Sequence, residues 1–378
     1  MIESIHIFWG PDSAFEEATK DLEDIAFLSD VLSFLNRTEM SIRGIQTQDG
    51  ETEVLSRQNL IISTDDYGGL REWALLGFTK NILENLKVEI KHVWLNNPPQ
   101  KIYDDIQRNN DKNRIIEKDT KKQPNLLDES LQLMADTYSN SIIGQDAVMK
   151  HIITALYSLN HTDRERPITL LFLGDSGVGK TETAKFIGKC MNHQMVRIQF
   201  SMQQTTYAYQ FIFGAEHGEN SLARELVRRE SNVVLLDEFD KVSPAFYNAF
   251  YQMFDEGWFV DANYRVDVRK SIIICTTNFL CEEDAEKYLG SPIYSRFSKV
   301  IKFNSLSVDN RIAIAQRRYS EILSRLNEKD QELISQNPIM QDFTDFIRQG
   351  QYTNMRMLKN DVEEAINYHV LKAKGILD

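Results

Sequence analysis

Cysteine is scarce in this sequence: Cys190, Cys275 and Cys281 are the only three among 378 residues. The count is odd and no two of them have the CxxC spacing, which excludes a disulfide framework. Long hydrophobic runs are missing too, because stretches such as residues 168–173 and 233–236 fall far short of the roughly 20 residues that a membrane-spanning helix needs. The amino terminus also lacks the features of a signal peptide. We therefore expect free thiols, a reducing cytoplasm and no membrane partner.

Positive charge is also in deficit. The chain has 43 Lys and Arg against 56 Asp and Glu, which gives a formal net charge of −13. This surplus of negative charge opposes non-specific attraction to nucleic acid or to anionic lipid, so we do not expect a nucleic-acid partner. What the chain does have is apolar residues, 42% of the total, enough for a core in each of two or three domains.

The chain divides into parts of different composition. Residues 1–97 hold two strand-like segments, 5–9 and 88–95, with helical patterns at 14–36 and 69–86 between them, which predicts a small α/β or α+β domain. Residues 98–125 are dense in polar and charged residues, so we expect a polar linker there. From residue 126 onward, helices alternate with apolar strands and glycine turns. That order predicts a parallel sheet with helices on both faces.

The most informative segment is a phosphate-binding loop. An apolar strand at residues 170–173 leads into Gly-x-x-x-x-Gly-Lys-Thr and then into a helical pattern. In such a loop the glycines and the first N–H groups of the helix surround phosphate oxygens, the lysine reaches the β- and γ-phosphates, and the threonine hydroxyl binds Mg²⁺. The sequence therefore predicts a site for ATP or GTP made by Gly174, Asp175, Ser176, Gly177, Val178, Gly179, Lys180, Thr181 and Glu182.

A second apolar strand, residues 232–236, ends in two adjacent carboxylates, Asp237 and Glu238. The carboxyl ends of parallel strands meet at the same edge of a sheet, so both acids should face the phosphates. We assign Asp237 to Mg²⁺, together with Thr181, and Glu238 to the polarisation of the attacking water. The two motifs together predict hydrolysis of a nucleoside triphosphate.

Several segments of the sequence resemble the Clp branch of the AAA+ ATPases, in particular the carboxy-terminal ATPase module of Clp disaggregases. The resemblance runs from about residue 139 to 373, and nothing in residues 1–125 shares it. It implies ATP as the nucleotide, an AAA+ core over residues 126–304 and a helical lid over residues 305–378. The segments that carry it are 142–146, 196–198, 233–241, 254–258, 275–278 and 306–307.

The same resemblance implies further site residues. Asn278 matches the sensor-1 position that orients the water, and its amide can donate to phosphate and accept from water. Arg296 matches the arginine finger that reaches the γ-phosphate of a neighbouring subunit. Arg356 matches the sensor-2 arginine, although the residues around it, Asn-Met-Arg-Met, differ from the usual Gly-Ala-Arg-Pro. Ile142 and Ile143 match the residues on either side of adenine, and ordinary core packing is the alternative for both.

One part of the family pattern is missing. Clp unfoldases carry an aromatic residue between glycines on a central pore loop, whereas the corresponding residues 213–221 have no aromatic at the tip. Just before them, Tyr207, Tyr209, Phe211 and Phe213 alternate with other residues. This period of two predicts the buried face of an extended segment, with the alternative that the four rings grip a client.

The resemblance implies an ATP-hydrolysing homo-oligomer, in this family typically a hexameric ring. It would remodel a protein client or complex, with residues 1–97 as the adaptor or recognition domain. The missing pore aromatic favours a second hypothesis, an ATP-gated oligomeric switch in signalling or defence that threads nothing and uses residues 1–97 as sensor or effector. A nucleic-acid motor is a third hypothesis, and the net charge of −13 speaks against it.

Overall fold

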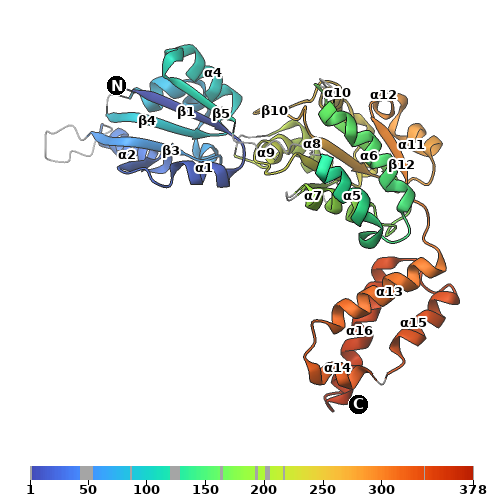
Figure 1. Cartoon of the computed structure of the whole chain (residues 1–378). Coiled ribbons are helices and arrows are strands. Elements are labelled where there is room, and N and C mark those ends of the chain that lie inside the picture. Colours follow the sequence, from blue (N-terminus) through green and yellow to red (C-terminus); the bar gives the residue numbers. More distant parts are fainter. Residues whose placement is uncertain are drawn as a thin grey trace.

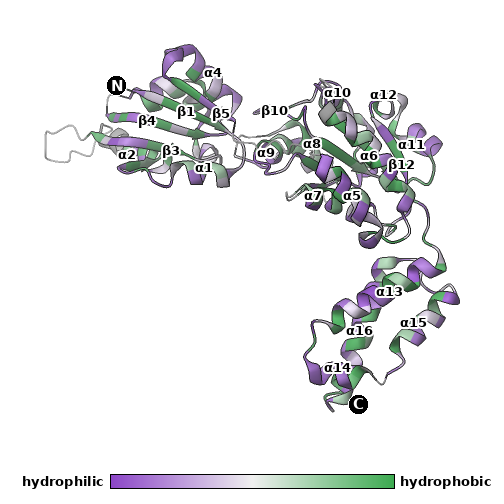
Figure 2. Cartoon of the chain, viewed as in Figure 1, coloured by the Kyte–Doolittle hydropathy of each residue, from purple (hydrophilic) through white to green (hydrophobic). Residues whose placement is uncertain are grey.

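A computed structural model describes residues 2–42, 54–85, 87–119, 128–161, 165–191, 195–200, 205–215, 218–335 and 337–377. The described chain forms two α/β domains followed by a bundle of helices (Figure 1). Hydrophobic residues are concentrated in the strands of both sheets, while the helices carry many hydrophilic residues (Figure 2). Among the described residues no helix combines the length and the apolar character needed to span a membrane. The α/β class, the helical carboxy-terminal part and the separate amino-terminal domain are confirmed.

The first domain is a five-stranded sheet in the order β2-β3-β4-β1-β5, and every pair in it is parallel. Helix α1 covers one face through Phe15, and α2, α3 and α4 cover the other. Because all strands are parallel, the domain is α/β and not α+β. Its elements are β1 Ser4–Trp9, α1 Asp12–Thr19, β2 Ile25–Phe27, α2 Leu28–Ile42, β3 Leu55–Ile62, α3 Glu72–Leu76, β4 Val88–Asn96, α4 Gln100–Asn109 and β5 Ile115–Asp119, with short 3₁₀ or π turns at Asp66–Gly69, Thr79–Leu83 and Lys112–Arg114.

The expected boundary at residue 97 is wrong, and so is the linker expected over residues 98–125. Helix α4 buries Ile102 and Ile106 in the core of the first domain, and β5 pairs with β1 from Ile5 opposite Ile115 onward. The first domain therefore extends to Asp119. Residues 120–125 lie outside the described residues. The polar composition that indicated a linker belongs to an amphipathic helix and to an edge strand, both of which expose charged side chains.

The second domain is also built on a parallel sheet, in the order β12-β6-β11-β8-β7. Successive side chains of β6 point to opposite faces, so Leu171 packs with α8 to α12 and Leu170 packs with α5 to α7. Its elements are α5 Asp128–Ser141, α6 Asp146–His161, β6 Ile168–Leu173, α7 Lys180–Cys190, β7 Val196–Gln199, α8 Thr205–Phe213, α9 Leu222–Val227, β8 Val233–Asp237, α10 Asn248–Asp255, β9 Trp258–Val260, β10 Arg265–Asp267, β11 Ile272–Thr276, α11 Glu282–Leu289, α12 Ser291–Tyr294 and β12 Lys299–Lys302.

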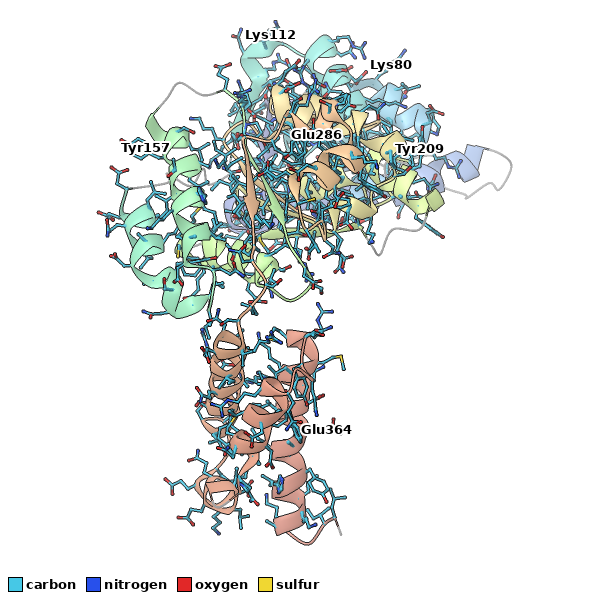
Figure 3. The ribbon with its side chains drawn as sticks, turned by 90° about the vertical axis from the view of Figure 1, so that its right-hand side faces the viewer. Lys80, Lys112, Tyr157, Tyr209, Glu286 and Glu364 are labelled. Carbon is cyan, nitrogen blue, oxygen red and sulfur yellow. The ribbon has the colours of Figure 1, made fainter. Side chains whose placement is uncertain are left out.

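The predicted extended segment around Tyr207 is wrong, because these residues form helix α8. Phe211 is buried, whereas Tyr207 and Tyr209 are 71% and 55% exposed. In a helix, residues two apart lie on different faces, so alternate aromatics cannot form one buried stripe. Tyr209 does contact Phe213 and Phe246 with ring centroids 4.9 and 6.1 Å away, and Figure 3 shows it at the edge of the second domain.

The carboxy-terminal part is a four-helix lid with a core of its own. Its elements are α13 Val308–Leu323, α14 Glu328–Ser335, α15 Ile339–Arg348 and α16 Met355–Ala373. Leu358, Val362 and Ile366 of α16 are fully buried against the other helices. The lid, which carries Glu364, lies apart from both sheets in two perpendicular views (Figures 1 and 3). A single chain segment, residues 303–307, leads to it from β12.

Candidate active site

A cavity of about 560 Å³ lies where the carboxyl ends of β8 and β11, the phosphate loop and the lid meet. Most of the predicted site residues line it, although they are spread over more than 200 positions of the sequence. These are Ile142, Ile143, Ser176, Gly177, Val178, Gly179, Lys180, Thr181, Glu182, Asp237, Glu238, Asn278 and Arg356. Gly174 and Asp175 belong to the same loop but do not line the cavity, and Arg296 lies outside it.

The phosphate loop requires glycine at two of its positions. Gly174 has φ +141°, and a Cβ there would lie 2.8 Å from the carbonyl oxygen of Phe303. Gly179 caps α7 with φ +109°, and a Cβ there would lie 3.3 Å from Ile142 Cγ2. The loop thus brings the N–H groups at the start of α7 to the cavity, where a helix amino terminus attracts anions.

Lys180 lies at the centre of this loop and is only 8% exposed. Its Nζ donates to the carbonyl oxygens of Gly174 and Asp175 at 2.6 Å each and lies 3.5 Å from Asn278 Oδ1. Burial lowers its pKa to about 8, and nearby carboxylates, Asp175 first among them, oppose that effect. A phosphate in the cavity would restore the stability of the ammonium form, because an anion next to a buried cation compensates its lost hydration.

Asp237 ends β8 and is 5% exposed. Its Oδ1 accepts from Thr276 Oγ1 at 2.5 Å and from Thr181 Oγ1 at 3.4 Å. Its Oδ2 accepts from Arg197 Nη2 at 2.6 Å and from Arg197 Nε at 3.0 Å. Thr181 and Asp237 therefore lie next to each other at the cavity wall, as two residues that are expected to bind the same Mg²⁺ must.

Glu238 follows with an unusual backbone conformation. Its φ is +57°, which is rare for a residue with a side chain, and its N–H donates to Thr276 Oγ1 at 2.9 Å. Its Oε2 is buried and has no hydrogen-bond partner among the residues that the structure describes. A buried carboxylate oxygen normally has a partner, so this free acceptor beside Asp237 suits a water molecule that attacks a phosphate.

The residues present also fit Mg²⁺. Thr181 and Asp237 offer oxygen ligands, and Mg²⁺ typically takes only one or two from the protein and the rest from phosphates and water. Within the described ranges, no three His, Cys, Asp or Glu side chains are grouped as a dedicated metal site. The donor set therefore matches a cation that arrives with a nucleotide.

The remaining cavity residues come from other elements. Asn278 follows β11, between the loop and Glu238. Arg356 lies in the first turn of α16. Asn354 is the N-cap of this helix, and its side-chain oxygen accepts a hydrogen bond from the Arg356 N–H at 2.9 Å. Ile142 is 8% exposed and belongs to the core cluster that also contains Val178. It packs in the core and also lines the cavity, so core packing is confirmed and the contact with adenine stays a prediction.

Arg296 is held on another surface of the second domain. Its Nε donates to Asp255 Oδ2 at 2.7 Å, Nη1 donates to the Pro292 carbonyl, and its guanidinium lies 4.4 Å from the ring centre of Tyr251. It does not reach the cavity of its own chain. An arginine in this position can act on a nucleotide only if that nucleotide belongs to another subunit.

Sequence reasoning missed several residues of the cavity. Arg197 is the most consequential, since it is ion-paired with Asp237. The motif Val-Arg-Ile at residues 196–198 marked the strand, and an arginine in a strand parallel to the one that ends in Asp237 was the available signal. The others are Ser141, Lys185, Gln199, Thr276, Leu306, Ile314, Arg317, Arg318, Glu321, Met355 and Lys359.

Comparisons with known proteins agree with this site. The model of the AAA domain (Cdc48 subfamily) matches residues 165–329. Chaperone protein ClpB of Malacoplasma penetrans is 26% identical over 305 residues, which cover 70% of this chain and 40% of that protein. Chaperone protein ClpB of Staphylococcus aureus is 31% identical over 235 residues, which cover 53% of this chain and 27% of that protein.

The chain spans less than half of the length of these curated relatives. The matched part includes the phosphate loop, the strands β8 and β11 that end at the cavity, and the start of the lid. Together with the geometry of the cavity, the matches show that residues 165–329 carry an AAA domain and that this part of the chain is similar to part of chaperone protein ClpB.

Proposed function

We propose that the chain binds Mg·ATP in this cavity and hydrolyses it. The observation that carries the proposal is the convergence of Lys180, Thr181, Asp237, Glu238 and Asn278, from the ends of three adjacent strands, on one cavity that the lid closes with Arg356. Each of these side chains suits one task of phosphoryl transfer to water.

The roles follow from the positions. The N–H groups of the loop and Lys180 hold the phosphates, and Thr181 and Asp237 hold Mg²⁺, which supplies positive charge to the transferring oxygens. The free Oε2 of Glu238 accepts a proton from the attacking water, and Asn278 orients that water. Ile142 and Ile143 would contact the adenine, while Arg356 would link the γ-phosphate to the position of the lid.

We further propose that the active form is a homo-oligomer, with a hexameric ring as the leading model, in which Arg296 completes the site of a neighbour. Its function would be to remodel a protein client or complex, with the first domain, residues 2–119, as the recognition domain. Similarity to the chaperone protein ClpB of two organisms supports this proposal for the ATPase part.

A second candidate, an ATP-gated switch without threading, is favoured by a specific observation. The segment that would carry a pore loop, of which residues 216 and 217 lie outside the described residues, is contacted by the first domain at Gly218. A domain seated on this segment suits a regulator of assembly better than an open channel for a client.

The decisive experiment is E238Q. The amide keeps the shape of the side chain but is no base, so turnover should fall by about 10²-fold or more. Nucleotide affinity should change little, because Glu238 contacts the water and not the phosphates. Steady-state ATP hydrolysis and binding of a fluorescent ATP analogue measure the two effects separately.

The matched control is E286Q, which makes the same change on an exposed face of α11, away from the cavity (Figure 3). This variant should hydrolyse ATP at the wild-type rate. Unchanged turnover in E238Q would remove Glu238 from the mechanism, and loss of nucleotide binding in E238Q would show that its role is structural.

A further inference from the structure

The carboxyl ends of the strands in the first sheet lie against helix α9 of the ATPase core (Figure 1). Arg224 of α9 donates from Nη2 to Asp65 Oδ1 at 2.6 Å and to the Thr64 carbonyl at 3.2 Å. Arg228 pairs with the same Asp65 at 2.9 Å and also with Asp12. Arg224 is only 7% exposed, so the carboxylate of Asp65 replaces much of the hydration that its guanidinium loses.

Backbone contacts lie beside the ion pairs. The N–H of Gln100 donates to the Asn263 carbonyl at 2.7 Å. Gly68 meets Gly218 so closely that a Cβ on Gly218 would lie 2.9 Å from Gly68 Cα. Tyr67, next to this glycine, is fully buried. A packed contact of this kind, with opposite charges on its two sides, is a specific interface and not a chance approach.

Helix α9 leads directly from this interface to the catalytic strand. It is followed by Arg229, whose Nε donates to Asn232 Oδ1 at 3.1 Å and whose Nη2 donates to the Asp267 carbonyl at 2.6 Å. Burial lowers the pKa of Arg229 to about 10, and the carboxylates of Asp267 and of Asp119, the last residue of β5, act against it. Strand β8 begins at Val233 and ends with Asp237. Arg229 and Asn232 thus link the end of α9 to the start of β8, the strand that carries Asp237.

We propose that this strand-end contact, formed by Asp12, Asp65 and Gly68 with Gly218, Arg224 and Arg228, restrains the ATPase core and makes the first domain its internal regulator. While the first domain is docked on the ATPase core, it fixes α9 and the segment before it. When the first domain is released, α9 is free to move with β8, and hydrolysis accelerates. The kinetic part of this inference rests on the proposed ATP hydrolysis, whereas the contact itself does not.

In α/β domains, ligands usually bind at the carboxyl ends of the strands of the parallel sheet. Here the ATPase core covers these strand ends, so a partner that binds the first domain there must compete with α9 for the same carboxylates. The chemistry of the edge selects a partner segment rich in Lys or Arg, because Asp12 and Asp65 already hold guanidinium groups. Binding of such a segment would relieve the restraint.

The test uses the full chain with two variants that open the contact by different means. D65K places a third cation beside Arg224 and Arg228, and G68V places a branched side chain where only 3.1 Å separates its Cβ from Gly218 Cα. Hydrogen exchange of residues 218–228 should accelerate in both variants, and ATP turnover should rise about fivefold or more, a coupling of ordinary size. The D65K/R228E pair should restore part of both values, because opposite charges face each other again.

The control is E16K, which makes the same charge change on an exposed residue of α1 and should alter neither quantity. Unchanged exchange in both D65K and G68V would overturn the contact. Faster exchange with unchanged turnover would overturn the regulation. A wild-type chain that hydrolyses no ATP would overturn the proposed function instead, and the exchange measurement would still decide whether the two domains are docked.

Discussion

At the scale of single residues, the ion pair between Arg197 and Asp237 bears on the proposed binding of Mg²⁺. The guanidinium occupies one carboxylate oxygen of the residue that is expected to hold Mg²⁺. A cation beside a metal site weakens the binding of another cation. We therefore expect Arg197 to serve as the counter-ion of Asp237 until Mg²⁺ binds with the nucleotide, and the two cations to compete for the same carboxylate.

R197Q should therefore strengthen the binding of Mg²⁺ to the ADP-loaded chain. The expected change is about threefold or more in the half-saturating Mg²⁺ concentration, since one like charge is removed a few ångströms away. Titration of Mg²⁺ followed by calorimetry measures it without any turnover. The matched variant R269Q removes an arginine that is similarly exposed and pairs with Asp267, and it should leave Mg²⁺ binding as it is. Weaker Mg²⁺ binding in R197Q would mean that Arg197 orients Asp237 for the metal instead of competing with it.

At the scale of elements, the phosphate loop was predictable from sequence because its signal is local. A strand, a glycine turn and a helix follow one another within about twenty residues, and each glycine has a position that a side chain would strain, such as Gly174 and Gly179. The strand ending in Asp237 was predictable for the same reason, since it is buried on both faces and therefore apolar throughout.

Other elements gave no such signal. Strand β5 lies at the edge of its sheet and exposes Ile116 to Asp119, so its composition is that of a loop. Strand β3 places Ser56, Arg57 and Gln58 on the surface before its apolar end. In α8 the aromatics at alternate positions imitate a strand, although only one side of the helix is buried. In each case tertiary contacts decide the structure, and the local pattern does not record them.

A buried hydrogen bond between Tyr138 Oη and Thr183 Oγ1, at 3.0 Å, joins helices α5 and α7. Y138F leaves the Thr183 hydroxyl, which is fully buried, without this partner, and should lower the free energy of unfolding by about 1–3 kcal/mol. The Y138F/T183V pair removes both polar groups and should cost less than the sum of the two single changes. Urea unfolding of the four chains completes the cycle, and strictly additive costs would show that the two hydroxyls do not interact.

At the scale of the whole molecule, the position of Arg296 predicts that catalysis depends on assembly. Because Arg296 lies outside the cavity of its own chain, turnover per chain should rise with protein concentration. R296A should lose that rise and run about 10³-fold slower than the assembled wild type, the usual effect of removing an arginine finger. ATP turnover measured over a dilution series gives both results.

Mixing two inactive variants sharpens this prediction. R296A keeps Glu238, and E238Q keeps Arg296, so a mixed ring holds some sites in which both residues are present. Mixtures should therefore recover part of the wild-type turnover. The control R265A removes an arginine that stacks on Trp258 at 4.3 Å, much as Arg296 stacks on Tyr251, and should stay active. Turnover that does not change on dilution would exclude a site shared between chains.

The docking of the two α/β domains was beyond the reach of the sequence. Its ion pairs join residues 159 or more positions apart, such as Asp65 and Arg224, and charged residues of this kind are common on any surface. The presence of a separate first domain could be predicted, because composition changes along the chain, but neither its end at Asp119 nor the surfaces that meet could.

The meeting of Gly68 with Gly218 also limits how the first domain can move. Two backbones in direct contact leave no room for a side chain on either one, so only a glycine of the first domain can face Gly218. The first domain offers two adjacent glycines there, Gly68 and Gly69, and a larger displacement along the chain would drive a Cβ into the opposite main chain. The proposed release therefore has few intermediate positions, and a graded response of a population would come mainly from the fraction of protomers whose first domain is undocked.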